Sequence, residues 1–537
     1  MLILDKENIK KKSEWESAKI KLPQFDYQKM CENTMENPVW VHFGSGNIFR
    51  GFIAALQQKL LDEGGEKSGI TAVETYDYEI IDEIYKPHDN LSIQVIMNPD
   101  GSLDNTVIAS VGESVIGDSG KEENWGRLNQ IFSEPSLQMA SFTITEKGYN
   151  LKGLSGNFAD EVQKDIKGGP SAPNNVMSKV SSLLYTRFKA GSLPIAMVSM
   201  DNCSHNGEKL YNAVKTIAYK WFENGSVKKE FLNYIDDRSK VTFPWTMIDK
   251  ITPRPSKSVE EKLEKLGING MEPIITGKNT YIAPFVNTEG PQYLVIEDDF
   301  PNGRPRLEKS GVYFTDRETV EKVERMKVCT CLNPLHTSMA VFGCLLGYTL
   351  IADEMKDREI VKLINKVGYK EGLPVVSDPE IIKPQDFIKE VMETRLPNPY
   401  IPDTPQRIAT DTSQKVGIRF GETIKAYAEN SNLDVKSLKY IPLVIAGWCR
   451  YLLGINDKGE KFEVSSDPLI GMLQGYLRDV ELGGKYKKGT LKPIFSNKDI
   501  FGIDLCKLGL GEKIEKYFEE MIEGKDAVRN TLKKYLE

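Results

Sequence analysis

Residues 39–52 read Val39-Trp40-Val41-His42-Phe43-Gly44-Ser45-Gly46-Asn47-Ile48-Phe49-Arg50-Gly51-Phe52. A short β-prone apolar run enters a glycine turn, after which apolar residues recur every four positions as far as Gly64-Gly65. This is the order of a strand, a tight turn, an amphipathic helix and its C-cap. Strand candidates at 70–73, 141–145 and 194–200 then alternate with helix candidates. The stretch therefore predicts an α/β, Rossmann-type domain with a mostly parallel sheet.

The pattern changes along the chain. Alternating β-type segments between residues 91 and 115 flank the turn Asn98-Pro99-Asp100-Gly101 and predict a β-meander. From about residue 316 onward, long helical periodicities dominate. We expect a Rossmann-type NAD-binding domain at residues 1–310, including an extra N-terminal segment, and a mainly α-helical substrate and catalytic domain at residues 311–537.

Composition limits the class of protein. A chain of 537 residues exceeds what one hydrophobic core usually supports, and a net charge of −7 gives no strong field for nucleic acid. Seven scattered cysteines do not resemble a disulfide framework. The polar N-terminus lacks a signal peptide, and the longest apolar run, Met339–Ala352, is too short to span a bilayer. We expect a cytoplasmic protein, a monomer or small homo-oligomer, whose partner is a small molecule.

The glycine turn is a candidate cofactor site. In a dinucleotide-binding fold the first glycine permits the turn, the second admits the pyrophosphate, and the helix N-terminus supplies N–H groups. Gly44, Gly46, Asn47, Ile48 and Phe49 stand at these places. Phe49 replaces the usual third glycine, and a strand–helix turn without a ligand would give the same pattern.

The end of the second strand bears on the choice of coenzyme. An acidic residue there would bind the adenosine ribose and repel a 2′-phosphate. Glu74 is the first candidate and Asp77 the second, and no lysine or arginine adjoins Glu74 in the sequence. These residues favour NAD over NADP.

A second motif, Met326-Lys327-Val328-Cys329-Thr330-Cys331-Leu332-Asn333-Pro334-Leu335-His336, carries one of only four histidines. Its lysine, asparagine and histidine can take a proton and hold an oxyanion without a metal. Cys329, Cys331 and His336 could ligate zinc, but no fourth ligand stands at finger spacing, so we expect no metal.

Six segments, in order, resemble the polyol-specific long-chain dehydrogenases, the mannitol dehydrogenase family. They are His42–Phe52, Thr143–Tyr149, Ser199–Asn202, Met247–Pro253, Val295–Phe300 and Lys327–His336. The resemblance implies an NAD-dependent, metal-independent secondary-alcohol dehydrogenase, with fructuronate reductase (D-fructuronate and NADH to D-mannonate) as the expected activity. Tagaturonate reductase, mannitol 2-dehydrogenase and mannitol-1-phosphate 5-dehydrogenase are alternatives within the family. A nucleotide-binding protein without turnover is the alternative of a different class.

The resemblance also implies roles for single residues. Lys327 would be the general acid and base, while Asn202 and Asn333 would bind the developing alkoxide. His336 would orient the substrate or hold the lysine. The remaining expected site residues are Asp249 in a supporting network, Arg395 in substrate contact, Lys415 and Arg407 as weaker candidates for that contact, and Thr145 and Asn202 at the cofactor.

One departure from the family pattern concerns helical phase. Members separate the lysine and asparagine by four residues, whereas five lie between Lys327 and Asn333. In a straight helix the extra residue would turn Lys327 from roughly 80° to roughly 180° away from His336. Pro334 disturbs the helix here, and a π-bulge would absorb one residue. We therefore predict a bulge or break between Val328 and Asn333. In the segment Asp249-Lys250-Ile251-Thr252-Pro253, Lys250 replaces the arginine usual in the family.

Overall fold

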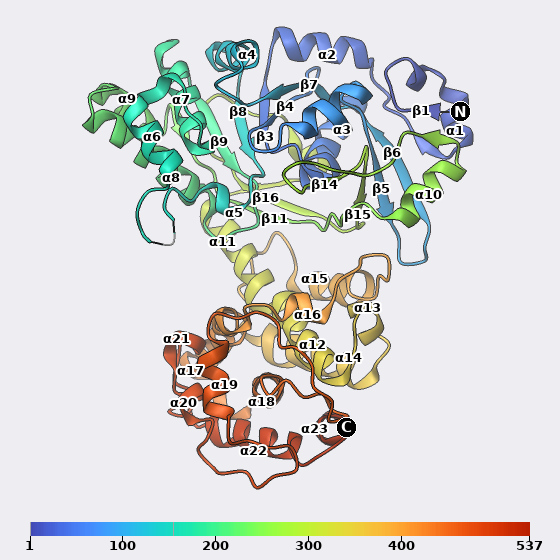
Figure 1. The fold of residues 1–537 in the computed structure, drawn as a ribbon, viewed down its shortest axis with the longest axis vertical. Coiled ribbons are helices and arrows are strands. Elements are labelled where there is room, and N and C mark those ends of the chain that lie inside the picture. The colour runs from blue at the N-terminus through green and yellow to red at the C-terminus, as the bar shows by residue number, and fades with distance from the viewer. Residues whose placement is uncertain (1, 154) are drawn as a thin grey trace. The chain divides into compact units, whose positions relative to one another are not determined.

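The protein forms two compact units in a computed structural model that describes residues 2–153 and 155–537 (Figure 1). The first unit extends to Glu321, and the second runs from Lys322 to Glu537. The first is α/β and the second is mainly helical, as the sequence predicts.

A six-stranded parallel sheet forms the centre of the first unit. Its order is β10-β9-β8-β3-β4-β7. The strands are β3 (Trp40–Phe43), β4 (Ile70–Glu74), β7 (Val111–Ile116), β8 (Met139–Phe142), β9 (Ile195–Ser199) and β10 (Val241–Thr242). The first strand of the glycine motif lies in the middle of this sheet, so its carboxyl end opens at the centre of the sheet edge.

Each face of this sheet is covered. Side chains alternate along a strand, so Val41 and Phe43 of β3 enter one core while Trp40 enters the other. The first core is closed by helices α4 (Glu122–Ser133), α7 (Val176–Lys189), α8 (Asn206–Glu223) and α9 (Lys229–Asp236). Figure 1 shows α6 (Asp160–Gly168) and the last three of these helices gathered beside β9. The second contains the helix that follows the glycine turn.

Smaller sheets complete the first unit. One has the order β15-β5-β6-β2 and another β11-β16-β17; β1 pairs with β12, and β13 with β14. The bounds are β1 (Leu2–Ile3), β2 (Ile20–Lys21), β5 (Ser92–Met97), β6 (Leu103–Ile108), β11 (Thr246–Asp249), β12 (Ile268–Asn269), β13 (Ile274–Ile275), β14 (Tyr281–Ile282), β15 (Phe285–Thr288), β16 (Tyr293–Glu297) and β17 (Tyr313–Thr315). The predicted meander is therefore wrong in one respect. β5 and β6 form a hairpin, but β7 leaves it to pair in parallel with β4, because its buried residues extend the central sheet.

The helices of the first unit mostly connect these strands. They are α1 (Lys12–Ser17), α2 (Tyr27–Glu36), α3 (Ala54–Asp62), α4 (Glu122–Ser133), α5 (Thr145–Gly148), α6 (Asp160–Gly168), α7 (Val176–Lys189), α8 (Asn206–Glu223), α9 (Lys229–Asp236) and α10 (Lys257–Lys265). Helix α11 (Arg317–Met326) begins in the first unit and ends in the second. Two π-helical turns, η2 (Phe49–Ile53) and η3 (Ile81–Tyr85), interrupt regular helix beside the central sheet.

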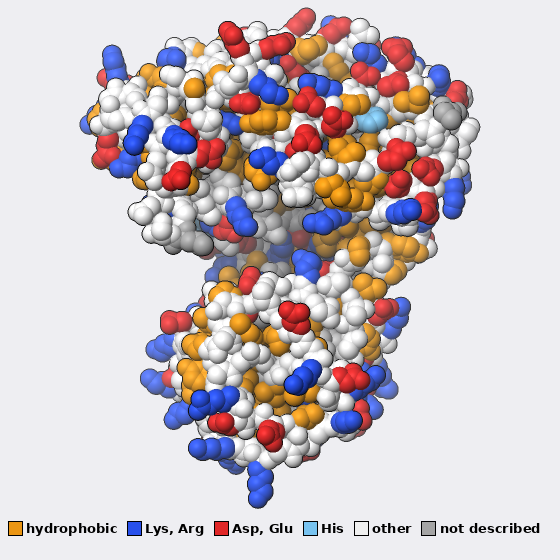
Figure 2. Space-filling model, in the orientation of Figure 1, with side chains coloured by type: hydrophobic (Ala, Val, Ile, Leu, Met, Phe, Trp, Pro, Cys, Tyr) orange, Lys and Arg blue, Asp and Glu red, His pale blue; other side chains and the backbone are white. Residues whose placement is uncertain are grey.

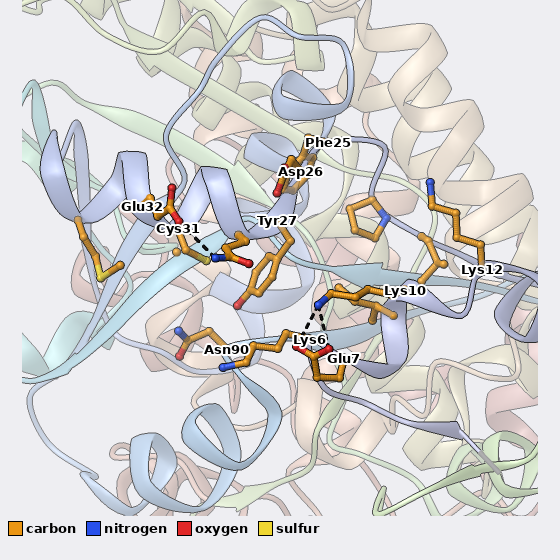
Figure 3. Close-up of a pocket in the computed structure, with 16 residues that line it drawn as sticks. Lys6, Glu7, Lys10, Lys12, Phe25, Asp26, Tyr27, Cys31, Glu32 and Asn90 are labelled. Carbon is orange, nitrogen blue, oxygen red and sulfur yellow. Dashed lines mark hydrogen bonds and ion pairs between the residues drawn. The ribbon is translucent and has the colours of Figure 1, made fainter.

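The N-terminal segment is fastened to the rest of the unit by strands and side chains. β1 and β2 each pair with a later strand, and the Tyr27 hydroxyl donates to the Asp89 carbonyl. This segment lines a pocket of about 680 Å³ (Figure 3). The charged lining residues are Lys6, Lys10 and Lys12 with Glu7, Asp26 and Glu32, so the pocket favours no one charge of ligand.

The second unit is built around the apolar helices α12 (Asn333–Leu346) and α18 (Tyr440–Tyr451), which pack together. The others are α13 (Ile351–Glu354), α14 (Arg358–Asn365), α15 (Pro384–Glu390), α16 (Pro405–Ile408), α17 (Glu422–Glu429), α19 (Ile470–Leu477), α20 (Lys492–Phe495), α21 (Lys498–Phe501), α22 (Gly511–Met521) and α23 (Ala527–Leu536). π-Helical turns recur at η7 (Lys327–Cys331), η8 (Lys366–Gly372), η10 (Val391–Arg395) and η12 (Gly417–Gly421).

Buried carboxylates fix helix ends in this unit. Glu371 accepts hydrogen bonds from the backbone N–H groups of Lys439, Tyr440 and Ile441, the first turn of α18. Asp357 caps α14 and also receives both terminal nitrogens of Arg529 from α23. Such carboxylates satisfy N–H groups that have no partner within the helix.

The distribution of charged and apolar side chains agrees with the composition. Figure 2 shows acidic and basic side chains intermixed on the visible face of each unit. The helical stretch Arg317–Leu346 is apolar and long enough to cross a membrane by length and composition, but 78% of its most apolar window is buried inside the protein, as in a core helix.

Glu354 predicts how stability depends on pH. Its side chain is fully buried, and neither carboxyl oxygen has a hydrogen-bond partner among the described residues. Burial, with the charges of Asp357 and Asp403, raises the pKa of Glu354 to about 9. The folded protein then holds a proton that the unfolded chain releases above about pH 4.5, so Glu354 makes stability fall as pH rises from about 4.5 to 9. We expect Glu354→Gln, which keeps the neutral shape, to raise the melting temperature by roughly 5 °C at pH 8.

The same variant should leave the melting temperature at pH 4.5 nearly unchanged. Glu359→Gln on the neighbouring helix α14, whose carboxylate pairs with Arg529 at 3.0 Å, is the control and should not stabilise the protein at pH 8. An equal effect of Glu354→Gln at both pH values would contradict a neutral buried carboxyl.

Candidate active site

The glycine turn is shaped by a close approach of two strands. Gly44 has φ of +101°, and a Cβ there would lie 2.2 Å from the Thr143 carbonyl oxygen. At Gly46 a Cβ would meet no protein atom within 4 Å. The first glycine is therefore required by the fold, while the second leaves the backbone open to a ligand, as a pyrophosphate site needs.

The residues after Gly46 begin a helix at Asn47. Asn47 accepts a hydrogen bond from Arg50 at 2.9 Å, and Ile48 is half-buried. The Phe49 side chain is fully buried and stacks on His42, with ring centroids 4.3 Å apart. Burial lowers the pKa of His42 to about 3, so this ring is neutral. The Phe49 side chain is thus a core residue, which leaves only its backbone for a cofactor.

Glu74 holds the glycine turn. One carboxylate oxygen accepts from the Ser45 N–H (3.1 Å) and hydroxyl (2.8 Å), and the other from the N–H groups of Tyr76 and Asp77. Protein donors therefore occupy both oxygens of a side chain that is only 6% exposed. Asp77, the second candidate, is also buried and accepts from the Thr276 hydroxyl at 2.6 Å.

Two lysines from distant parts of the chain approach the turn that follows β4, at residues 75–78. Lys179 Nζ donates to the Thr75 carbonyl (3.3 Å) and the Tyr78 hydroxyl (3.0 Å). Lys278 Nζ lies 5.0 Å from the ring centroid of the exposed Tyr76. Sequence reasoning missed both cations, because they reach residues 75–78 only in the folded chain.

The ends of β8 and β9 are tied by Asp201. Its carboxylate accepts from the N–H groups of Ile144 (3.0 Å) and Thr145 (2.8 Å) and from the Tyr149 hydroxyl (2.6 Å). Thr145 has φ of +64° at the start of α5, a strained position that these bonds secure. Asn202, the residue after Asp201, is exposed at the carboxyl end of β9.

Asp249 is buried at the end of β11. Lys250, which replaces the family arginine, donates to the Glu289 carbonyl oxygen at 2.5 Å and to Gln292 Oε1 at 3.2 Å. Glu289 in turn accepts from the Ile251 N–H at 2.8 Å. The changed cation therefore has a local role in holding this loop.

The predicted bulge between Val328 and Asn333 is confirmed. Residues Lys327–Cys331 form a π-helical turn closed by the Leu332 N–H to Lys327 carbonyl hydrogen bond (3.1 Å), and Leu332 leaves helical geometry with φ −129° and ψ −62°. α12 then begins at Asn333. The extra residue is absorbed, which returns Lys327 toward the face that the family spacing would give it. Lys327 is buried, with 4% of its surface exposed.

His336 lies one turn into α12. Its Nε2 is 3.3 Å from Asp403 Oδ2, and Arg407 donates to both oxygens of Asp403 at 2.7 Å. Burial acts to raise the pKa of Asp403, but His336 and Arg407 together hold it below its usual value. Sequence reasoning missed Asp403, which lies 67 residues beyond His336 in the chain.

Three cationic residues of the second unit, Arg395, Lys415 and Arg419, are candidates for contact with an anionic substrate. Arg395 is buried at the end of η10. Lys415 donates to the Thr410 carbonyl, and burial, with the charges of Arg419 and Arg407, lowers its pKa. Arg419, on η12, donates to the hydroxyl of Thr337, the residue that follows His336 in the sequence. Arg419 was not among the predicted site residues, although it follows Lys415 by four positions, one helical turn.

The predicted residues divide between the two units. Gly44, Gly46, Asn47, Glu74, Thr145, Asn202 and Asp249 belong to the first, and Lys327, Asn333, His336, Arg395 and Lys415 to the second. In residues 2–153 and 155–537, no three or more His, Cys, Asp or Glu side chains are grouped to hold a metal. Burial raises the pKa of the Cys329 thiol to about 11, so it is a neutral packing residue.

Comparison with known proteins gives matches over both units. The profile "Mannitol dehydrogenase Rossmann domain" matches residues 38–309, and "Mannitol dehydrogenase C-terminal domain" matches residues 319–522. The chain is 57% identical over 532 residues to a D-mannonate oxidoreductase of Thermotoga maritima, covering 98% of each. It shares its fold with a D-sorbitol dehydrogenase (TM-score 0.79, 24% identity, 96% and 98% coverage). The Pseudomonas fluorescens mannitol 2-dehydrogenase, solved with NAD and D-mannitol, is a further structural neighbour (TM-score 0.70, 24% identity, 100% and 99% coverage).

Alanine at the two glycines should separate folding from ligand binding. Gly44→Ala meets the Thr143 carbonyl and a left-handed backbone, so we expect a lower melting temperature and weaker NADH binding. Gly46→Ala should keep the melting temperature yet weaken NADH binding by roughly 10-fold or more, because its methyl group would point into space needed by the pyrophosphate. NADH fluorescence titration measures both affinities. Wild-type affinity in Gly46→Ala would show that the pyrophosphate does not lie at this turn.

Proposed function

Since the chain belongs to the mannitol dehydrogenase family, we propose that it is an NAD-dependent secondary-alcohol dehydrogenase that reduces D-fructuronate to D-mannonate. The observation that carries the substrate is the 57% identity, over 98% of both chains, to a protein named D-mannonate oxidoreductase. The seven cysteines are free thiols, which agrees with a cytoplasmic enzyme, and we expect a monomer or small homo-oligomer.

The first unit would hold the coenzyme. The open backbone at Gly46 and the helix start at Asn47 suit a pyrophosphate, and the carboxyl end of β4 suits the adenosine ribose. Glu74 would act there chiefly by fixing the turn, because four protein donors already occupy it. Thr145, whose N–H is bound by Asp201, and Asn202, the residue after Asp201, would lie toward the nicotinamide end. When bound, NADH supplies the hydride that reduces the carbonyl carbon.

The second unit would supply the proton. Lys327 is buried on the π-helical turn, the position that the family motif gives to the proton-transferring lysine. In reduction its ammonium would protonate the alkoxide oxygen, and in oxidation its amine would take the hydroxyl proton. The amide groups of Asn202 and Asn333 would donate to the same oxygen. His336, held by Asp403, would present Nδ1 to a substrate hydroxyl or to the lysine.

Substrate profiling tests this function. We expect NADH oxidation by the purified protein, with EDTA present, to be fastest with D-fructuronate among fructuronate, tagaturonate, fructose and fructose 6-phosphate. Parallel assays with NADPH measure the preference for NADH. Fastest turnover of tagaturonate, fructose or fructose 6-phosphate would assign one of the other family activities instead.

Replacing the proposed acid tests the mechanism. Lys327→Met should lower kcat by roughly 10²–10⁴-fold while NADH affinity stays at the wild-type value, because only the proton transfer is lost. Lys356→Met, at a residue whose side chain is 75% exposed, is the matched control and should be fully active. Unchanged turnover in Lys327→Met would exclude this lysine as the acid. NADH binding by the wild-type protein without turnover of any substrate would favour the nucleotide-binding alternative.

A further inference from the structure

We propose that Arg419 binds the carboxylate of the sugar acid and so sets the preference for acids over neutral ketoses. This inference rests on the proposed function, since it identifies the group that would recognise the end of the substrate carrying the charge. D-Fructuronate and D-fructose differ only at that terminal carbon, which is a carboxylate in one and a hydroxymethyl group in the other.

Arg419 belongs to a segment that packs against the two elements carrying the proposed chemistry. It belongs to η12, which packs against η7, the turn that carries Lys327, and against α12. Its Nη1 donates to the hydroxyl of Thr337, the neighbour of His336. The backbone of η12 packs closely against Phe501, because a Cβ at Gly421 would lie 2.0 Å from the Phe501 carbonyl oxygen. The guanidinium is thus presented by a closely packed segment.

The partners of Arg419 do not balance its charge. Burial alone lowers its pKa to about 10, and among the described residues no carboxylate pairs with it. A guanidinium has five N–H donors, and this one donates to a single hydroxyl. Arginines taken out of water are ordinarily paired or fully hydrogen-bonded. An anion arriving here would gain a partly desolvated, charge-assisted and bidentate contact.

Other arginines in the chain show the contrast. Arg187 donates to four carbonyl oxygens and Arg450 to three, so each is satisfied by the backbone. Arg407 is bidentate to Asp403, at 2.7 Å for both contacts, and that carboxylate already occupies it. Arg407 therefore acts by positioning Asp403 and His336, which leaves Arg419 as the better carboxylate receptor.

Lys415 strengthens the preference for an anion. It lies four residues before Arg419, and the charge of Arg419 contributes to the lowering of its pKa. Mutual repulsion of these two cations is relieved when an anion binds near them. The unit thus combines one guanidinium for recognition with a second positive charge that raises the local potential.

Steady-state kinetics of Arg419→Gln test the proposal. We expect KM for D-fructuronate to rise roughly 30-fold with a smaller change in kcat, while the kinetic constants for D-fructose change little. Arg419→Lys should recover part of the affinity, since it keeps the charge but not the bidentate geometry. Arg478→Gln, at an 80% exposed position, controls for loss of one positive charge. Arg395→Gln tests the competing arginine in the same assay.

The outcomes separate this proposal from the proposed function. Reduction of D-fructuronate by the wild-type enzyme tests the function by itself. An unchanged ratio of fructuronate to fructose kcat/KM in Arg419→Gln would overturn the role of Arg419, as would a loss of that ratio only in Arg395→Gln. If the wild-type protein reduces no ketouronate, the thermal shift given by D-mannonate relative to mannitol decides the anion site. A shift by D-mannonate that disappears in Arg419→Gln supports it, and one that persists overturns it.

Discussion

The second unit depends on how the chain accommodates one extra residue between Lys327 and Asn333. A regular helix turns about 100° per residue, so the five residues between Lys327 and Asn333 would rotate the lysine away from His336. The π-helical turn at Lys327–Cys331 and the break at Leu332 take up that rotation. Pro334 suits the break because it stands in the first turn of α12, where a missing N–H costs little. The irregularity therefore sets the helical phase of the buried Lys327 relative to α12.

Buried carboxylates perform the corresponding task elsewhere. Glu74 fixes the glycine turn, Asp201 fixes the ends of β8 and β9, and Glu371 fixes the start of α18. Each accepts several backbone N–H groups that the secondary structure leaves unpaired. Because most of these bonds come from backbone N–H groups, these residues hold chain geometry. A carboxylate that looks like a ligand in the sequence can thus be structural at the same edge of a sheet.

The sequence predicted what depends on local pattern. The strand, glycine turn and helix at Trp40–Leu60 follow from apolar spacing, and the bulge follows from a residue count and a proline. It failed where distant segments meet. β7 appeared to continue a meander but joins β4, and Asp403 reaches His336 from a later helix connection. Lys179 and Lys278 approach the turn after Glu74 only in the folded chain. Such contacts are set by packing, which no local period encodes.

The fate of buried ionisable groups explains why one arginine stands apart. Burial keeps His42 neutral by lowering its pKa to about 3, and it keeps Glu354 neutral by raising its pKa to about 9. An arginine with a pKa of about 10 keeps its charge at neutral pH, so burial must be offset by acceptors. Arg187 and Arg450 obtain them from carbonyl groups, whereas Arg419 has one hydroxyl. A permanent charge held by a packed segment with so few acceptors is poised for an anion, and a sugar acid carries one.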